Sequence, residues 1–169
     1  MIAMRRFAAF LGACLVAASA RPVQAADLKA LEFLLGDWEA VGTPPGQSGA
    51  FIFSLAVQEK VIVRTNYAQY PARDAQPATR HDDLMVIFPD DGALKADYFD
   101  SEQHVIHYVV TPHGPTEVVF VSEPRPSEPR YRLTYTLGAD KLLKGTFEIA
   151  PPGAADFKPY LTWSARKLK

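Results

Sequence analysis

Two polar residues in the middle of a strand-like segment are the first candidates for chemistry. The segment "KVIVRTNYAQ" covers residues 60–69, and on a strand Arg64 and Asn66 share one face because side chains alternate. If that face lines a cavity, the guanidinium and the amide can hold a carboxylate or another polar head group. Arg64→Ala is then expected to weaken binding and to leave the melting temperature nearly unchanged. If the face carrying Val61 and Val63 lines the core instead, both residues are ordinary surface groups.

The spacing of the four histidines does not indicate a metal site. His104 and His107 are three residues apart, so on a strand they lie on opposite faces and cannot bind one ion together. His81 and the two aspartates that follow it are interpreted as a polar turn. His107 shares its face with two valines, and it is therefore the histidine that we expect inside a cavity.

Residues for covalent catalysis are not recognisable. The sequence has a single cysteine, Cys14, and no Gly-x-Ser-x-Gly motif. Asp97 and His107 can form an acid–base pair if their strands are neighbours, and Tyr98 is one of several aromatic residues expected to line the interior. We predict no catalytic residue and no metal ligand. The predicted ligand-binding residues are Arg64, Asn66, Tyr98 and His107.

The elements that position these residues are predicted to be short strands. After Gly36 the apolar residues recur with a period of two, which is typical of strands with one buried face. Turn sequences such as "PDDG" at 89–92 separate the strands, and longer connections at 71–82 and 123–130 are expected to be surface loops. The ten predicted strands cover residues 37–42, 50–57, 60–69, 83–88, 93–99, 104–110, 116–122, 130–137, 142–149 and 160–167.

A short helix is predicted just before the strands. The segment "DLKALEFLLG" has apolar residues at helical spacing, with Asp27 as N-cap and Gly36 as the stop. Strands joined in sequence order form a meander, and closing the meander into a barrel removes both exposed edges. The predicted fold class is therefore all-β: a closed antiparallel up-and-down β-barrel of about ten strands with one short N-terminal helix.

The start of the sequence has the features of a secretory signal peptide. Arg5 and Arg6 precede the apolar run "FAAFLGACLVAASA", and "VQA" at 23–25 offers the small residues at which a signal peptidase cleaves. The run is shorter than the roughly 20 residues that cross a bilayer. We therefore expect residues 1–25 to be removed on export.

The remaining residues, 26–169, are expected to form one periplasmic or secreted domain without a transmembrane segment. An alternative is a lipoprotein, because "LGAC" at 11–14 resembles a lipobox with Cys14 as the acylated residue. The full chain has a formal net charge of −1, and the signal segment holds arginines but no acidic residue. The mature domain is therefore acidic, without a basic block, and nucleic acid is not an expected partner.

The first strand resembles that of the calycins, the group that contains lipocalins and fatty-acid-binding proteins. In lipocalins a short helix leads into a Gly-x-Trp motif, which "GDW" at 36–38 matches. The resemblance implies that Trp38 packs across the closed end of the barrel, with a basic residue of the last strand over its ring. "TWSARK" at 162–167 offers Arg166 for that position and Lys167 as second choice. A cation over an indole stabilises by roughly 0.5–2 kcal/mol.

Other stretches, such as "KADYFDSEQHVIHYVV" and "LKGTFEIAPPG", are similar to bacterial lipocalin-like domains. Nitrobindin-type haem barrels share the Gly-x-Trp start and bind haem through a histidine close to the C-terminus. The last histidine here is His113, so haem is not expected, and no other cofactor is predicted.

The resemblance predicts a binding protein for a small, largely apolar ligand held in the barrel. One alternative is a barrel enzyme, an isomerase or cyclase that confines a hydrophobic substrate, with His107 or Tyr98 giving acid–base help. Another is a ligand-free barrel that acts through its surface. The binding protein is the leading hypothesis of the three.

Overall fold

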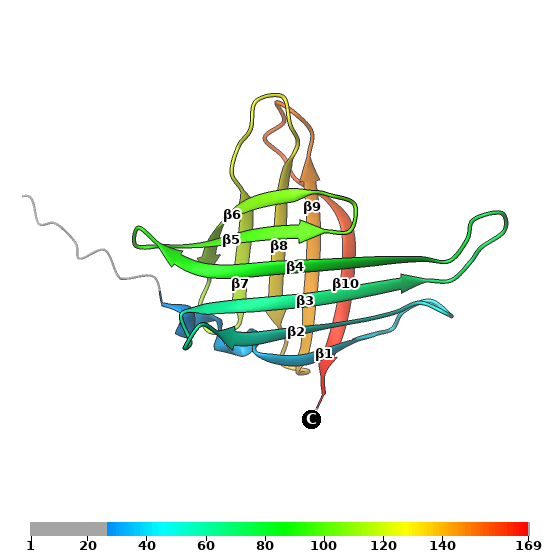
Figure 1. The fold of residues 1–169 in the computed structure, drawn as a ribbon, viewed down its shortest axis with the longest axis horizontal. Helices are drawn as coiled ribbons and strands as arrows, with labels where there is room; N and C mark the ends of the chain where they lie inside the picture. The colour runs from blue at the N-terminus through cyan, green and yellow to red at the C-terminus, as the bar shows by residue number, and fades with distance from the viewer. Residues whose placement is uncertain (1–26, 169) are drawn as a thin grey trace, which may run out of the picture.

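The strands predicted from the sequence are present and close into a ring (Figure 1). The computed structural model describes residues 27–168. Each strand pairs antiparallel with its sequence neighbours, and the first strand pairs with the last. The predicted fold class is therefore confirmed, while the predicted signal peptide and Cys14 lie outside the described residues. The strands are β1 (Gly36–Val41), β2 (Ser48–Ala56), β3 (Val61–Tyr70), β4 (Thr79–Asp90), β5 (Ala93–Asp100), β6 (Val105–Pro112), β7 (Glu117–Ser122), β8 (Arg130–Leu137), β9 (Leu142–Ala150) and β10 (Lys158–Lys167).

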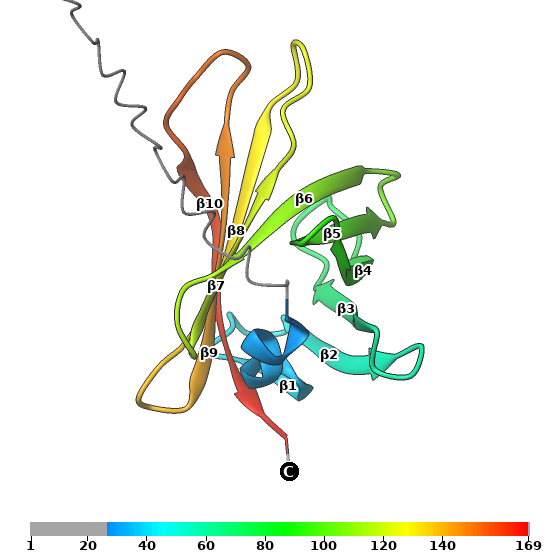
Figure 2. The same ribbon diagram turned by 90° about the vertical axis from the view of Figure 1, so that its left-hand side faces the viewer.

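The barrel has two walls whose strands cross each other. Strands β2–β6 run across the view of Figure 1, and β7–β10 stand upright behind them, as Figure 2 shows from the side. Successive strands run in opposite directions, so their connections alternate between the two ends. One end, the closed end, has the turns at 57–60, 91–92, 113–116 and 138–141. The other, the open end, has the connections at 42–47, 71–78, 101–104, 123–129 and 151–157, most of them longer.

The predicted helix is present as a 3-10 helix, η1 (Leu28–Leu34), and it lies at the closed end (Figure 2). The Asp27 side chain accepts a hydrogen bond from a backbone N–H of the first turn, as an N-cap does. Leu31 and Leu34 are fully buried. The indole of Trp38, which is 1% exposed, donates from Nε1 to the carbonyl oxygen of Leu34 at 2.7 Å. Apolar packing and this hydrogen bond together hold η1 against the barrel.

The basic side chain over Trp38 is that of Lys167 and not that of Arg166. The Lys167 Nζ lies 5.5 Å from the centre of the indole ring. Arg166 lies on the outside, where its guanidinium binds the carboxylate of Glu39 at 2.8 Å. Adjacent residues of a strand point to opposite faces, and the β1–β10 register places Trp38 opposite Lys167. Lys167, the second choice made from the sequence, therefore replaces Arg166 as the residue over the indole ring.

Aromatic side chains fill the middle of the barrel. The ring of Tyr135 packs edge-on against Phe53, Phe120 and Trp163, with centroid distances of 5.6, 6.3 and 5.8 Å. Gly145 lies opposite Trp163 on the neighbouring strand, and a Cβ at this position would overlap the Trp163 ring. The glycine therefore lets the indole lie across β9. The middle layer of the barrel is therefore occupied by side chains.

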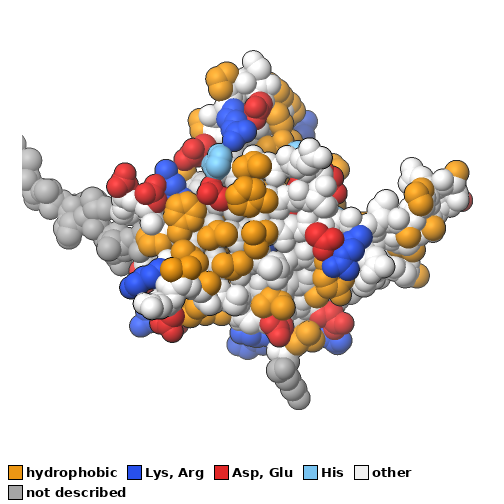
Figure 3. Space-filling model, in the orientation of Figure 1, with side chains coloured by type: hydrophobic (Ala, Val, Ile, Leu, Met, Phe, Trp, Pro, Cys, Tyr) orange, Lys and Arg blue, Asp and Glu red, His pale blue; other side chains and the backbone are white. Residues whose placement is uncertain are grey.

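Large apolar side chains also lie on the outside of one wall. Figure 3 shows apolar side chains gathered over β2–β6, and five large ones at outward-facing positions of these strands are 38–45% exposed. The five residues are Ile52, Leu84, Phe99, Val105 and Val109. This wall is therefore apolar on both faces. Within residues 27–168, no helix is long and apolar enough to cross a membrane.

Candidate functional site

A charged pair lies inside the barrel next to the aromatic layer. Arg64 of β3 is 4% exposed, and its guanidinium binds the carboxylate of Asp83 on β4. The Arg64 Nη1 also donates a hydrogen bond to the Tyr135 hydroxyl at 2.5 Å. Asn66 donates from Nδ2 to the second oxygen of Asp83 at 2.7 Å. Arg64 and Asn66 therefore point inward, which is the first of the two arrangements considered from the sequence.

Nearly all polar atoms of this pair have partners, as a buried ion pair requires. Removing each ion from water costs several kcal/mol, which only good geometry and further hydrogen bonds offset. The exception is the Arg64 Nε, which is buried and has no acceptor within residues 27–168. Burial disfavours the charged guanidinium, but contacts with Tyr135 and Asp83 outweigh this and hold the pKa of Arg64 above its ordinary value.

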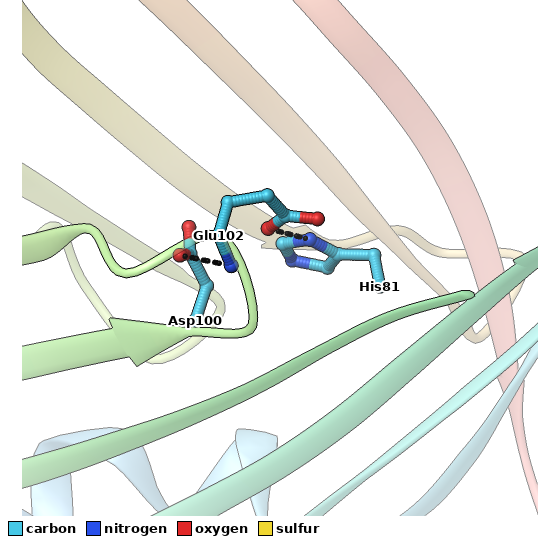
Figure 4. Close-up of side chains that lie close together, drawn as sticks. All are labelled: His81, Asp100 and Glu102. Atoms are coloured by element: carbon cyan, nitrogen blue, oxygen red, sulfur yellow. Dashed lines mark hydrogen bonds and ion pairs between the residues drawn. The ribbon is translucent and has the colours of Figure 1, made fainter. Parts of the chain in front are cut away.

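A histidine connects the buried pair to the open end. The Nε2 of His81 lies 3.2 Å from an Asp83 oxygen and 3.3 Å from the Tyr98 hydroxyl. Its Nδ1 lies 2.7 Å from the Glu102 carboxylate (Figure 4). The exposed fraction of the side chain rises from 4% for Asp83 through 27% for His81 to 49% for Glu102. These residues thus form a continuous polar path from solvent to the buried ion pair.

Asp100, at the end of β5, lies beside this path. Its carboxylate accepts hydrogen bonds from the backbone N–H groups of Glu102 and His104 at 3.0 and 2.9 Å, and from the Tyr98 hydroxyl at 3.3 Å. Burial raises the pKa of Asp100, but the hydrogen bonds from His104 and Glu102 outweigh it and bring the pKa below its ordinary value. We call the following residues the polar cluster: Arg64, Asn66, His81, Asp83, Tyr98, Asp100 and Glu102.

Tyrosine hydroxyls surround the polar cluster. Burial is the main reason that the pKa is raised for Tyr98, Tyr108, Tyr131 and Tyr135. These hydroxyls therefore stay protonated at neutral pH and can donate hydrogen bonds. Smaller contributions to the raised pKa of Tyr131 come from the carboxylates of Glu128 and Asp100.

Aromatic rings continue from Tyr131 along the upright wall at the open end. Tyr131 stacks on Phe147 with a centroid distance of 5.8 Å and an interplanar angle of 11°. Phe147 meets Tyr160 edge-on at 6.3 Å, and Tyr160 is 67% exposed. We call these three residues the aromatic row. The open end thus has polar groups from β3–β5 and apolar rings from β8–β10.

His107 lies outside the barrel, and its expected place in a cavity is wrong. Its Nδ1 lies 2.6 Å from Asp97 on the neighbouring strand, and the two side chains are 44% and 36% exposed. The inward residues of β6 are Tyr108 and Val110, while Val109 faces out with His107. The suggested Asp97–His107 pair does form, but on the outer face.

The histidine of the site, His81, was interpreted from the sequence as part of a turn. In the structure β4 begins at Thr79, so His81 and Asp83 are alternate strand residues that both face inward. Arg80 and Asp82 face outward and bind each other at 2.8 Å. Charged residues on both faces hide the alternation that identifies a strand, so the sequence carried only a weak signal for this segment.

Two hollows near the open end lie apart from the polar cluster. One, of about 480 Å³, lies beneath the projecting β3–β4 hairpin, and its lining includes Gln47, Tyr70 and Gln76. The other, of about 20 Å³, lies beside His107 and Tyr131 and has room for about one water molecule. Neither is an enclosed cavity inside the barrel. The polar cluster is therefore a candidate for contacts at the mouth and not for a deep pocket.

No model of a protein family matches the sequence of this chain, and no curated protein matches it.

Proposed function

We propose that this protein is an exported, calycin-like barrel that binds a small ligand at its open end. The polar cluster holds the polar part of the ligand. The observation that carries the proposal is the Arg64–Asp83 pair, which is buried inside an otherwise aromatic barrel and connected to solvent through His81. A packed barrel folds without internal charges, and apolar replacements of a buried ion pair are often neutral or stabilising. Charged groups at such a place are typical of a binding site.

The calycin-like part of the proposal is supported by the closed end. The closed ring of ten strands, the helix before Trp38 and the lysine over the indole ring agree with the Gly-x-Trp resemblance. Export is supported by the signal-like features of residues 1–25. The periplasm or the cell exterior is then the place where the ligand is met.

The charges of the polar cluster favour a ligand that donates hydrogen bonds or carries positive charge. Asp83 and Tyr135 engage both terminal nitrogens of Arg64, and among the described residues only its buried Nε lacks a partner, so the guanidinium does not offer a ligand carboxylate two N–H groups. Asp100 and Glu102 add two further carboxylates near the rim. The carboxylate ligand suggested by the sequence is therefore replaced in this proposal by a ligand with a cationic or hydroxyl-bearing head.

The body of the ligand is proposed to lie on the aromatic row. Aromatic faces provide apolar contact area with little loss of side-chain entropy, and a cationic head also interacts favourably with their π-systems. Tyr160, the most exposed ring, lies at the outer end of this row. A ligand with a polar head and an apolar body thus matches the two sides of the open end.

Native mass spectrometry of the protein purified from a bacterial periplasm tests the proposal. We expect an additional mass that leaves on denaturation and that is reduced in Glu102→Gln and in Tyr160→Ser. Asp97→Asn is the matched control, because Asp97 also binds a histidine but lies on the outer face. Bare protein in every preparation, or an equal loss in the control, contradicts the proposal.

A second candidate function is acid–base catalysis, which one contact favours. The Tyr98 hydroxyl lies 3.3 Å from His81 Nε2, and Glu102 contacts the other ring nitrogen, so the imidazole has a hydroxyl and a carboxylate within hydrogen-bond distance, as a general acid–base group requires. The same preparation separates the candidates. A binding protein releases its ligand unchanged after incubation, whereas an enzyme releases a different molecule.

A further inference from the structure

We infer that the polar cluster binds a divalent transition-metal ion between His81, Asp100 and Glu102. One donor atom from each of these side chains lies within 4.8 Å of the other two (Figure 4). His81 projects from β4, Asp100 ends β5, and Glu102 lies in the connection that follows. The β4–β5 pairing places the strand of His81 beside that of Asp100. No metal ligand is predicted from the sequence, in which His81 is interpreted as part of a polar turn.

The donor atoms suit an ion of intermediate character. One imidazole nitrogen and two carboxylate oxygens match Zn²⁺ or Mn²⁺, whereas Mg²⁺ and Ca²⁺ favour oxygen ligands alone. Three protein ligands also leave coordination positions free for water or for an external ligand. The 49% and 27% exposure of the Glu102 and His81 side chains gives an ion access from solvent.

A buried carboxylate behind His81 is the second observation that points to a metal. Asp83 lies 3.2 Å from Nε2 and is held by Arg64 and Asn66, so it fixes the imidazole with Nδ1 toward Glu102. Metal-binding histidines almost always have such a carboxylate or carbonyl on their other nitrogen. The Arg64–Asp83 pair then has a definite task, which is to orient the ligand imidazole.

The carboxylates of Asp100 and Glu102 have no lysine or arginine partner among the described residues. Within residues 27–168, their ionic partners are histidines only. An ion between the two carboxylates would balance their charge.

The inference deepens the proposed function and rests on it only in placing the site at the open end. The ion supplies the positive charge that the carboxylates favour, and its free positions can bind an oxygen or nitrogen atom of an organic ligand. A cationic head and the ion would compete for Asp100 and Glu102, so with the ion bound the head of the ligand is the hydroxyl-bearing one, and its oxygen takes a free position on the ion.

Calorimetric titration of the metal-free protein with Zn²⁺, Mn²⁺ and Mg²⁺ tests the inference. We expect one equivalent of Zn²⁺ or Mn²⁺ to bind, with Mg²⁺ weaker, and the affinity to fall more than about tenfold in His81→Gln and in Glu102→Gln. His107→Gln is the matched control, because His107 binds Asp97 on the outer face without a third ligand. Its affinity should equal that of the unmodified protein.

We expect the Glu102→Gln variant to fold normally, because Glu102 is exposed at the rim. Circular dichroism checks its fold. Absence of one-equivalent binding, or equal losses in Glu102→Gln and His107→Gln, overturns the inference. The proposed function fails separately. A co-purifying organic mass in protein that binds no Zn²⁺ or Mn²⁺ supports the proposed function and rejects the metal site. Bound metal without any co-purifying organic mass supports the metal site and rejects the proposed function.

Discussion

The two ends of this barrel differ in what their side chains do. At the closed end, Trp38, Leu31 and Leu34 are almost fully buried, and their contacts are apolar apart from one indole hydrogen bond and the Lys167 ammonium over the indole ring. At the open end, the inward positions carry ions and amides, and the exposure of the side chains rises stepwise toward solvent. The same strands pass through both ends. Stability and recognition are therefore separated along the barrel axis, and variants at one end should leave the other largely unchanged.

The largest effect is expected from Trp38→Ala at the closed end. Removing a buried tryptophan should lower the free energy of unfolding by roughly 3–5 kcal/mol, because it leaves a cavity beneath η1. Urea denaturation measures this loss. Glu102→Gln at the open end is the control, and as an exposed substitution it should change stability by less than about 0.5 kcal/mol. Similar losses in the two variants would show that the ends are not separate.

Arg64→Met is the next test, because it probes the deepest part of the open-end network. The substitution leaves Asp83 buried without its cation, and we expect a loss of about 3 kcal/mol. This corrects the expectation from the sequence that the melting temperature would hardly change. The double variant Arg64→Met with Asp83→Leu should recover most of the loss in a double-mutant cycle. A double variant as unstable as the single one would show that the pair itself stabilises the fold.

The pH dependence of stability should distinguish the ends further. The pKa of Asp100 is below its ordinary value of 3.8, so the unfolded chain takes up a proton before the folded protein does. The stabilisation from ionised Asp100 is complete above that value and is lost as the pH falls below it, through the folded pKa. The free energy of unfolding, measured between pH 6 and pH 2.5, should therefore fall less with decreasing pH for Asp100→Asn than for the unmodified protein. The difference amounts to about 1.4 kcal/mol for each unit by which folding lowers the pKa of Asp100. Parallel curves would contradict this assignment.

The smallest effect concerns the two basic residues that end β10. Lys167→Met removes the cation over Trp38 and should cost about 0.5–1 kcal/mol. Arg166→Met removes only an exposed ion pair with Glu39 and should cost less than about 0.5 kcal/mol. Chemical denaturation of both variants under identical conditions gives the comparison. A larger loss in Arg166→Met would reverse the structural assignment of the closing residue.

The fold could be predicted because turns and alternation are local features of the sequence. The Gly-x-Trp start and the turn residues identified the strand number and the position of η1. The start of β4 was predicted four residues too late, because charged side chains at 80–83 occupy both of its faces. Alternation identifies a strand only where the two faces differ.

The candidate site could be predicted only in part, because it depends on register and on which face is inward. Arg64 and Asn66 were correctly placed on one face, but their partner Asp83 follows from the β3–β4 register, which the sequence does not contain. His107 was misplaced because β6 carries apolar residues on both faces, with Val105 and Val109 outside. The apolar outer surface of this wall removed the signal that normally separates inside from outside.

The contact between Tyr135 and Trp163 has an optical consequence. The sequence contains two tryptophans, and Trp38 lies at the closed end. Trp163 packs on Tyr135, whose hydroxyl accepts a hydrogen bond from Arg64. A change at the polar cluster therefore reaches one fluorophore through two contacts, while the other is held beneath a helix. In a Trp38→Phe background, the emission of Trp163 becomes an intrinsic reporter of what occupies the mouth of the barrel.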